Sequence, residues 1–557
     1  MSTLKHRLTL RHWKYLFYAL IILFFLIFVL LPVLYSFVYV FSNWETVRWH
    51  VLTDEKLVSL FGRSILISLL VSGVVVAIDI VLALPLAWFL AKREIRGKDL
   101  IDTLVDLPLV IPTAAVGFST TLFFAKELTV ELTRTGAPAL FSSPLAIVIL
   151  LHISFTLPYM VRSMKAGIEE VDLTYEFAGE CFGATKFTVA RTITLPIMKA
   201  AIVTGIILCL ARSLSETGAT FLALSMVTNV DYGTLTSSST LTGPALINSL
   251  KNAGYPYINE ALGFMSMVLI ALSIGLLAIV KIFAEKFHFP FRKVYSLENL
   301  LSSRKIGILR DATGILLFLF LALIPSLFIL AYIPQQWGQS VHIDYGKLLS
   351  SLGVSLIVAT LTTLICIATA IPLAVYIARA RERKSAEILD MLANIPIIVP
   401  TVALGISLGL FWKNFFNINN DALVILVIVL AHVSFTYPFL VRTFAAAMRQ
   451  IPPDYEEAAK TLGAGPFAVF RKIVYPLFKP SIIAGVIMIF TRSLDETGAT
   501  IAVIPANAEI TTIPVYIVNL VKAKDYYSAA IASLILLIIA IIVLLAIRIT
   551  MGGRKKC

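Results

Sequence analysis

Recurrent long apolar stretches constrain the fold of this chain more than any other feature of its sequence. A helix of about 20 residues crosses about 30 Å of hydrocarbon, and only helices or closed barrels satisfy every backbone hydrogen bond there. We expect about twelve such spans, near residues 15–41, 64–91, 104–125, 144–163, 197–224, 259–283, 312–333, 351–379, 391–412, 422–443, 479–504 and 527–549. The sequence therefore predicts an all-α membrane protein embedded in a lipid bilayer.

Composition excludes several other classes of protein. Of the 557 residues, 59% are hydrophobic and 14% are charged, which is too little charge to cover the surface of a soluble protein. The net charge of +13 comes from bases that flank the apolar stretches, a pattern of membrane topology rather than of nucleic-acid binding. The cysteines and histidines have no metal-ligand spacing, so we expect no metal site. The first apolar stretch is too long for a signal peptide and lacks a small-residue cleavage site.

An internal repeat divides the chain into two halves. Residues 152–220 and 432–500 align without a gap at an offset of 280 (432 − 152). Upstream, DLPLVIPTAAVG at 106–117 matches NIPIIVPTVALG at 394–405. Because the number of spans is even, we expect two parallel, pseudo-symmetric halves of six helices each. The first half is placed at 1–285, a cytoplasmic linker at 286–310 and the second half at 311–557.

Basic residues set the expected orientation. They cluster in the N-terminal tail, in the loops 92–98 and 379–384 and in the linker, whereas the opposite connections hold few. The chain is expected to be a multi-pass protein of the cell (inner or cytoplasmic) membrane. The positive-inside rule then places both termini and both repeated polar loops in the cytoplasm. The stretch 281–311 mixes bases with phenylalanines, so an interfacial helix is expected there.

Paired prolines mark the third span of each half. Pro108 and Pro112 correspond to Pro396 and Pro400. Proline is excluded from an undisturbed helix interior, so a kinked or broken span is favoured over a simple helix start at these prolines.

The polar middle of each repeat predicts a compact elbow. Each begins with Tyr-Glu, continues through an Ala-containing helical turn to Gly183 or Gly463, and closes at Pro196 or Pro476. The order helix, Gly turn, helix and Pro is typical of a two-helix elbow that fits a groove on a partner protein.

The second elbow resembles the EAA loop of the permease subunits of ABC importers that work with substrate-binding proteins. Glu-Ala-Ala, then Gly, then Ile and Pro match the family pattern, with Tyr475 in place of Leu, while the first elbow has Phe177-Ala178-Gly179 in place of Glu-Ala-Ala. The resemblance implies that both elbows couple to an ATPase through Glu176, Ala178, Gly183, Ile193, Pro196, Glu457, Ala458, Ala459, Gly463, Ile473 and Pro476.

The same resemblance implies the partners. They are two copies of a cytoplasmic ATPase subunit and an extracytoplasmic substrate-binding protein. The chain itself has no phosphate-binding loop, because neither Gly-Lys pair is followed by Ser or Thr. We therefore expect a translocation subunit rather than an enzyme, with no cofactor bound directly and with ATP used by the partner.

Repeated charged boxes lie deep in the fifth span of each half. RSLSETGAT contains Arg212, Glu216 and Gly218, and RSLDETGAT contains Arg492, Asp495, Glu496 and Gly498. Arg and Glu at i and i+4 share one helix face, and intramembrane charges are paired or line a wet path. A structural ion pair and a gate or pathway wall are both open, and the two are compatible.

Three other intramembrane polar residues leave alternatives open. His152 and His432 hold either a structural hydrogen bond or a transport role, and Asp79 either lines a cavity or pairs locally.

Taken together, the sequence predicts the membrane permease of an ATP-driven importer that moves a small polar solute inward by alternating access. The ETGAT boxes resemble those of molybdate, tungstate and sulfate permeases, so an oxyanion is the first choice. The fused arrangement resembles ferric iron and thiamine permeases, and unpaired Glu216, Asp495 and Glu496 favour a cation. An ion-gradient-driven secondary transporter is the alternative of another class, but that class does not call for two Gly-Pro elbows. An ion channel fits less well, because no stretch resembles a selectivity filter.

Overall fold

All regular secondary structure in the described part of the chain is helical, which confirms the predicted all-α class. The computed structural model describes residues 16–127, 143–227, 241–251, 254–286, 298, 301–335, 343–380, 383–416, 420–450, 452–505 and 509–552. The Ser/Thr stretch at 236–240 and most of the linker, including the bases and phenylalanines at 287–297, lie outside the described residues.

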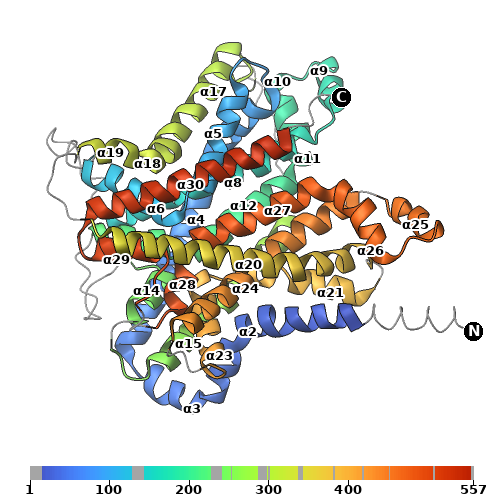
Figure 1. Cartoon of the computed structure of the whole chain (residues 1–557). Helices are drawn as coiled ribbons and strands as arrows, with labels where there is room; N and C mark the ends of the chain where they lie inside the picture. The colour runs from blue at the N-terminus through green and yellow to red at the C-terminus, as the bar shows by residue number, and fades with distance from the viewer. Residues whose placement is uncertain are drawn as a thin grey trace, which may run out of the picture.

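The helices follow one another with short connections (Figure 1). In the first half they are η1 (Phe25–Leu30), α2 (Leu31–Ser42), α3 (Trp44–Thr46), η2 (Val47–Val51), α4 (Glu55–Lys92), α5 (Lys98–Val110), α6 (Thr113–Thr121), η3 (Leu122–Glu127), α8 (Pro144–Glu169), α9 (Leu173–Cys181), α10 (Lys186–Val189), η4 (Ala190–Thr194), α11 (Leu195–Ile197), α12 (Lys199–Ser215), α13 (Gly218–Val227), α14 (Gly243–Lys251) and α15 (Ile258–Lys286). In the second half they are α17 (Arg304–Phe318), η5 (Leu319–Leu323), α18 (Ile324–Leu327), α19 (Ile329–Gln335), α20 (Tyr345–Arg379), α21 (Lys384–Leu392), α22 (Ile395–Ile398), α23 (Thr401–Lys413), α24 (Asp421–Gln450), α25 (Asp454–Thr461), α26 (Pro466–Val469), η6 (Phe470–Val474), α27 (Tyr475–Asp495), α28 (Gly498–Val503), α29 (Ile513–Lys522) and α30 (Tyr526–Gly552).

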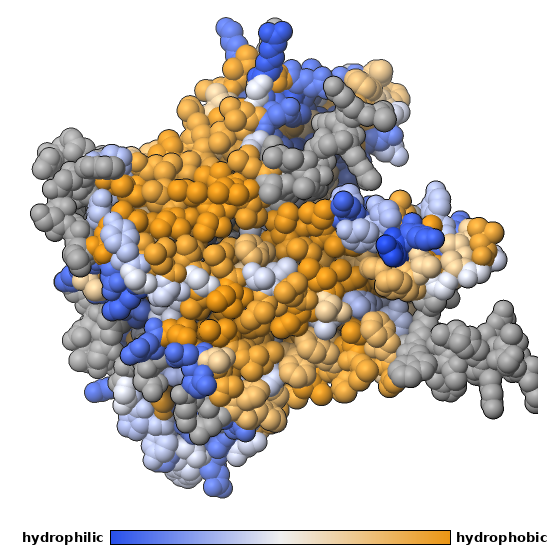
Figure 2. Space-filling view, in the orientation of Figure 1, coloured by the Kyte–Doolittle hydropathy of each residue, from blue (hydrophilic) through white to orange (hydrophobic). Residues whose placement is uncertain are grey.

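These helices supply between nine and twelve membrane spans in the described residues. Nine helices are long and apolar enough to cross a bilayer, and three bent pairs raise the number to 12 if each pair is one span. Each of the twelve predicted spans falls on one of these elements. Figure 2 shows the apolar surface as a belt over α17, α20 and α30, with hydrophilic residues on either side.

The second proline of each pair, Pro112 or Pro400, stands at a break of the third span, as predicted, whereas Pro108 lies inside α5 and Pro396 lies in the first turn of α22. In the first half, α5 and α6 meet at 99° around Pro112, and in the second half the helices on either side of Pro400 meet at 107°. Both prolines stand immediately before a new helix, where the missing N–H is not needed.

The fifth spans are also interrupted, which corrects their predicted bounds of 197–224 and 479–504. Helix α12 ends at Ser215 and α13 begins at Gly218, and α27 likewise ends at Asp495 before α28 begins at Gly498. The backbone is extended at the first residue of each interruption, Glu216 or Glu496. Each charged box is therefore a helix break rather than part of a continuous helix.

The first span of each half packs on the other half. Ser407 of α23 accepts a hydrogen bond from the N–H of Ser36 in α2 (2.8 Å) and donates to the carbonyl of Pro32 (2.8 Å). The mirror contacts join Ser119 of α6 to Pro325 (2.7 Å) and Ile329 (2.9 Å). In Figure 1, α2 accordingly runs beside the second half, and α17 and α18 run beside the first. Each half thus packs its first span against the other half, so that the two halves are interlocked.

Candidate functional site

Both polar loops form the predicted elbow of helix, Gly turn and helix. In the first, α9 leads through Gly183 to α10 and η4, and in the second, α25 leads through Gly463 to α26 and η6. Gly183 and Gly463 have φ angles of 82° and 86°, which side chains other than glycine adopt only with strain. The two elbows, marked by α9 and α25, project from the same side of the helical bundle (Figure 1).

A carboxylate ties each elbow to the end of the second span. Glu176 accepts from Lys92 (2.8 Å) and from Thr194 (2.7 Å). At the matching position, the buried Glu456 accepts from Arg379 at 2.6 Å. Glu176 is one of the coupling residues predicted from the sequence, but its partner Lys92 and the Arg379–Glu456 pair are not among the predicted residues. The repeated opposite charges at 92 and 176, and again at 379 and 456, were the available signal.

The tips of the elbows are exposed. Phe182 and Leu462 next to the glycines are 93% and 89% exposed. Ala178, Ala458 and Glu457 are also exposed, whereas Ala459 is half-buried. Apolar side chains that stand so far out of a protein usually meet a partner.

The remaining coupling residues hold each elbow together from inside. Ile193 and Ile473 are half-buried, and a Cβ added to Gly179 would lie 2.8 Å from the Ile193 side chain. This close approach leaves little room for a side chain at position 179. Pro196 and Pro476 stand in the first turn of the helices that leave the elbows, where proline is tolerated.

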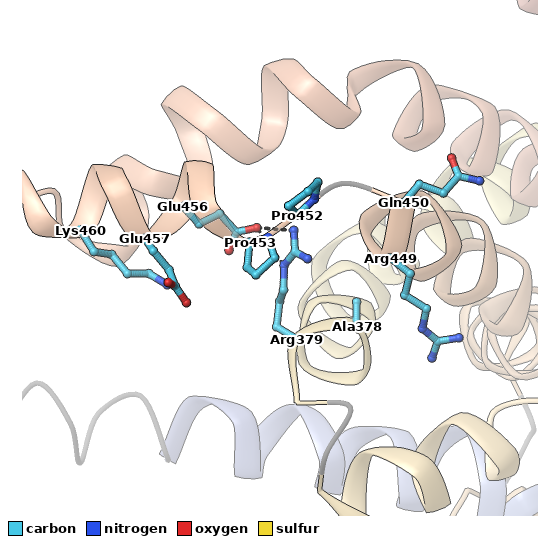
Figure 3. A pocket seen from close by; sticks show the side chains of 9 residues that line it. All are labelled: Ala378, Arg379, Arg449, Gln450, Pro452, Pro453, Glu456, Glu457 and Lys460. Carbon is cyan, nitrogen blue, oxygen red and sulfur yellow. Dashed lines mark hydrogen bonds and ion pairs between the residues drawn. The ribbon is translucent and has the colours of Figure 1, made fainter.

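A pocket of about 420 Å³ lies under the second elbow, where α24 passes into α25 (Figure 3). Its lining residues are Ala378, Arg379, Arg449, Gln450, Pro452, Pro453, Glu456, Glu457 and Lys460. Arg449 also pairs with Asp390 at 2.9 Å. The pocket therefore lies between the Arg379–Glu456 ion pair and the exposed face of α25.

The same face of the first elbow carries a different charge. Glu169, Glu170, Asp172 and Glu180 are all exposed there, and the second elbow has Arg449, Gln450, Pro452 and Lys460 at these positions. The Thr174 N–H bonds the Asp172 carboxylate at the start of α9 and lowers the pKa of Asp172. The two elbows thus share a backbone shape but not a surface potential.

Ion pairs close the two charged boxes. Arg212 pairs with Glu216 at 3.0 Å, and Arg492 pairs with Asp495 at 2.6 Å and with Glu496 at 3.4 Å. The second oxygen of each glutamate accepts the N–H of Ala219 or Ala499, both at 2.9 Å. These buried carboxylates therefore hold an arginine and also the first turn of the following helix.

The two boxes meet at the centre of the molecule. A Cβ added to Gly218 would lie 2.6 Å from the side chain of Thr497, and one added to Gly498 would lie 3.0 Å from Thr217. Only glycine permits this approach. Asp495 additionally accepts a hydrogen bond from the N–H of Thr113, at the break of the third span in the other half. The first half has Ser215 in place of Asp495. The contact of a carboxylate in the box with the third span of the other half is therefore a feature of the second box.

The buried histidines serve the packing of the same region. Nδ1 and Nε2 of His152 lie 2.8 Å from Ser213 and Thr220, and His432 makes the same contacts with Ser493 (2.7 Å) and Thr500 (2.8 Å). Both ring nitrogens are thus used in structural hydrogen bonds across the helix break. Asp79 is fully buried, and its carboxylate has no hydrogen-bond partner within the described ranges.

Metal binding has no support within the described residues, where no three His, Cys, Asp or Glu side chains gather in a ligand-like group. The charged side chains of the boxes are instead committed to one another.

Twelve potential spans, two interlocked halves and a pair of exposed elbows define a polytopic membrane transport subunit. The chain belongs to the family of binding-protein-dependent transport system inner membrane components, which it matches twice, over residues 83–289 and 370–551. Two matches in one chain show that it fuses two copies of the family's domain, as the internal repeat predicts.

Among characterised relatives, the chain is similar to sulfate and molybdenum permeases. It is 37% identical over 165 residues to the sulfate transport system permease protein CysT of Salmonella typhimurium, an alignment that covers 27% of this chain and 57% of that protein. It is 32% identical over 197 residues to the molybdenum transport system permease protein ModB of Escherichia coli, over 34% of this chain and 80% of ModB. ModB of Mycobacterium tuberculosis is 31% identical over 198 residues, which cover 34% of this chain and 74% of that protein.

Proposed function

We propose that this chain is the translocation subunit of an ATP-driven importer, and that its solute is a small oxyanion such as molybdate, tungstate or sulfate. The observation that carries the proposal is the double match to the permease family together with two exposed elbows on one side of the bundle. Similarity to sulfate and molybdenum permeases supports the choice of solute. Unpaired carboxylates would favour a cationic solute, but Glu216, Asp495 and Glu496 are all paired with arginines.

The proposed mechanism is alternating access at the contact of the two boxes. Two copies of a cytoplasmic ATPase subunit dock at the elbows and hydrolyse ATP, so this chain binds no cofactor itself. A substrate-binding protein delivers the solute at the opposite face. The gate consists of the ion pairs in the two boxes and of the close contacts of Gly218 with Thr497 and of Gly498 with Thr217. It opens when the elbows move. In this proposal the chain spans a cell membrane with the elbows on the cytoplasmic side. Both termini and the linker then also lie in the cytoplasm, in accord with the positive-inside rule.

Uptake by vesicles that contain the chain, its ATPase and its binding protein tests this function. We expect ATP-dependent uptake of at least one of tungstate, molybdate and sulfate. Uptake of thiamine or ferric iron without any oxyanion would overturn the choice of solute. Uptake that follows an ion gradient without ATP would overturn the class of transporter, and the chain purified alone is expected to show no ATPase activity.

A further inference from the structure

The linker between the two halves touches the first elbow. Glu298 uses both of its carboxylate oxygens there, one accepting from the hydroxyl of Thr188 in α10 (2.6 Å) and the other pairing with Arg191 in η4 (2.5 Å). Four residues further along the linker, the hydroxyl of Ser302 accepts from the N–H of Phe187 (3.0 Å) and donates to the carbonyl of Glu298 (2.8 Å). We call these contacts the linker clasp.

The linker clasp is enclosed by protein, unlike an ion pair on an open surface. Glu298 is only 5% exposed, and the side chain of Arg191 is 19% exposed. A carboxylate leaves water at a high cost unless its oxygens are paired and hydrogen-bonded, and here a guanidinium and a hydroxyl meet both oxygens. Removing one partner would strand a buried charge, so single substitutions should open the clasp.

Beyond the clasp, the linker leads directly into α17, which is fixed on the first half. Asp311 of α17 pairs with Arg93 at the end of α4 (3.0 Å). A Cβ added to Gly314 would lie 3.0 Å from the Cβ of Pro85 in α4, so the two helices are in close contact. In Figure 1 the upper end of α17 accordingly lies next to α10. Because α4 also holds α9 through Lys92, the first elbow is held from two sides.

The second elbow lacks the residues that would form such a clasp. At the matching positions of the repeat (468 − 188 and 471 − 191 are both 280) it has Ala468 and Arg471. Ala468 offers no hydroxyl, and Arg471 is exposed and makes no ion pair within the described residues. The elbow that lacks the Glu-Ala-Ala pattern is therefore the one that the linker holds.

The helices after the clasp continue to the gate. The carbonyl of Pro325 in α18 accepts from the hydroxyl of Ser119 in α6 (2.7 Å). Helix α6 in turn packs against α13 at the gate, because a Cβ added to Gly117 would lie 2.6 Å from the Cα of Ala219. Packed helices with little free volume transmit displacements. An unbroken series of contacts thus runs from the first elbow through the linker, α17 and α18 to the gate.

We propose that the linker clasp makes the first elbow and α17 move as one body, so that movement of the ATPase at this elbow reaches the gate through α17 and α18. The inference rests on the proposed function and extends it by assigning Glu298, Thr188, Arg191 and Ser302 as positioning residues for coupling. The clasp stays closed throughout the transport cycle. The fusion of the two halves thereby supplies the first elbow with a mechanical connection that the second elbow does not use.

ATPase activity stimulated by the solute-loaded binding protein, measured with uptake in reconstituted vesicles, tests the clasp. We expect Glu298→Ala and Arg191→Ala each to lower both rates about tenfold, equivalent to about 1.4 kcal/mol. Arg191→Lys keeps a cation opposite Glu298 and should retain most of the coupling. Lys305→Ala is the control, because it removes a charge from an exposed position at the start of α17 that makes no ion pair within the described residues. It should couple as the unaltered chain does.

A covalent bridge tests whether the clasp stays closed. The pair Thr188→Cys and Glu298→Cys should lose coupling as Glu298→Ala does, in a chain whose exposed Cys181 and terminal Cys557 are replaced by serine. A short bifunctional thiol reagent that joins the two new thiols through disulfides should restore coupling, and reduction should remove it again. Coupling that stays lost in the bridged protein would show that the clasp must open, and would overturn the proposal.

Hydrogen exchange distinguishes a failure of the clasp from a failure of the proposed function. Glu298→Ala should weaken the protection of α10 and η4 and leave α25 and α26 unchanged, and this result does not depend on transport. Full coupling in both alanine variants, together with ATP-dependent oxyanion uptake, would overturn the clasp while the proposed function stands. Absence of ATP-dependent uptake by the unaltered chain would overturn the proposed function itself.

Discussion

Single residues at the elbow turns carry a backbone requirement that no side-chain contact explains. A Cβ on Gly183 or Gly463 would meet nothing within 4 Å, yet both residues have φ above 80°. We predict that Gly463→Leu and Gly183→Leu each cost about 1–2 kcal/mol locally and uncouple transport by misplacing the elbow. The measurement is transport and stimulated ATPase activity in reconstituted vesicles.

Asparagine provides the matched control for both glycines. It tolerates left-handed backbone angles better than other residues with a side chain, so Gly463→Asn should keep most of the activity that Gly463→Leu loses. Thermal unfolding of the membrane domain should be similar in all variants, because the glycines lie in exposed turns. Full activity of both Leu variants would show that the elbows are mere connectors.

The two elbows also differ at one exposed position, where the second elbow has Glu457 and the first has Phe177. Both side chains are exposed on the face that would meet an ATPase, but only a carboxylate pairs with a base there. We predict that Glu457→Ala reduces stimulated ATPase activity more than Phe177→Ala, and that added salt narrows the difference. A larger loss with Phe177→Ala would show that apolar contact dominates docking.

At the scale of elements, an ion pair in the described part of the chain ties each elbow to its span. Removing one partner leaves a partly buried charge uncompensated, which typically costs about 3 kcal/mol. We therefore predict that Arg379→Ala detaches α25 from α20 and abolishes ATPase stimulation, with a smaller loss for Lys92→Ala because Thr194 still bonds Glu176. The double variant Arg379→Ala/Glu456→Ala should recover part of the loss, since no charge is stranded. Protection of α25 from hydrogen exchange measures the detachment, and unchanged protection in Arg379→Ala would contradict it.

The elements that the sequence predicted well are those with a local cause. Apolar length marked the spans, Pro112 and Pro400 marked the broken helices, and Gly183 and Gly463 marked the turns. The interruption after Ser215 and Asp495 was missed because apolar residues continue past the charged boxes. The basic partners of Glu176 and Glu456, Lys92 and Arg379, were missed because they lie more than 70 residues away in the chain.

On the scale of the whole molecule, the interlocking of the halves was beyond the reach of the sequence. A repeat gives both halves similar surfaces, so a first helix finds much the same apolar groove on its own half and on the other. The choice between them depends on the course of the connections, which carry no motif. The structure resolves it through matching serines: Ser407 of α23 bonds the backbone of α2, and Ser119 of α6 bonds the backbone of α18 and α19.

This interlocking predicts which engineered disulfides join the halves. Ser36→Cys with Ser407→Cys, and Ser119→Cys with Ile329→Cys, place thiols on helices that touch across the pseudo-axis. After a protease site inserted between residues 290 and 296 is cut, we expect each oxidised pair to keep the two fragments together on a non-reducing gel. Ser72→Cys with Ser213→Cys is the matched control, because these side chains are 2.9 Å apart within the first half and their disulfide leaves the fragments separate. Separate fragments in all three variants would mean that each first helix packs on its own half.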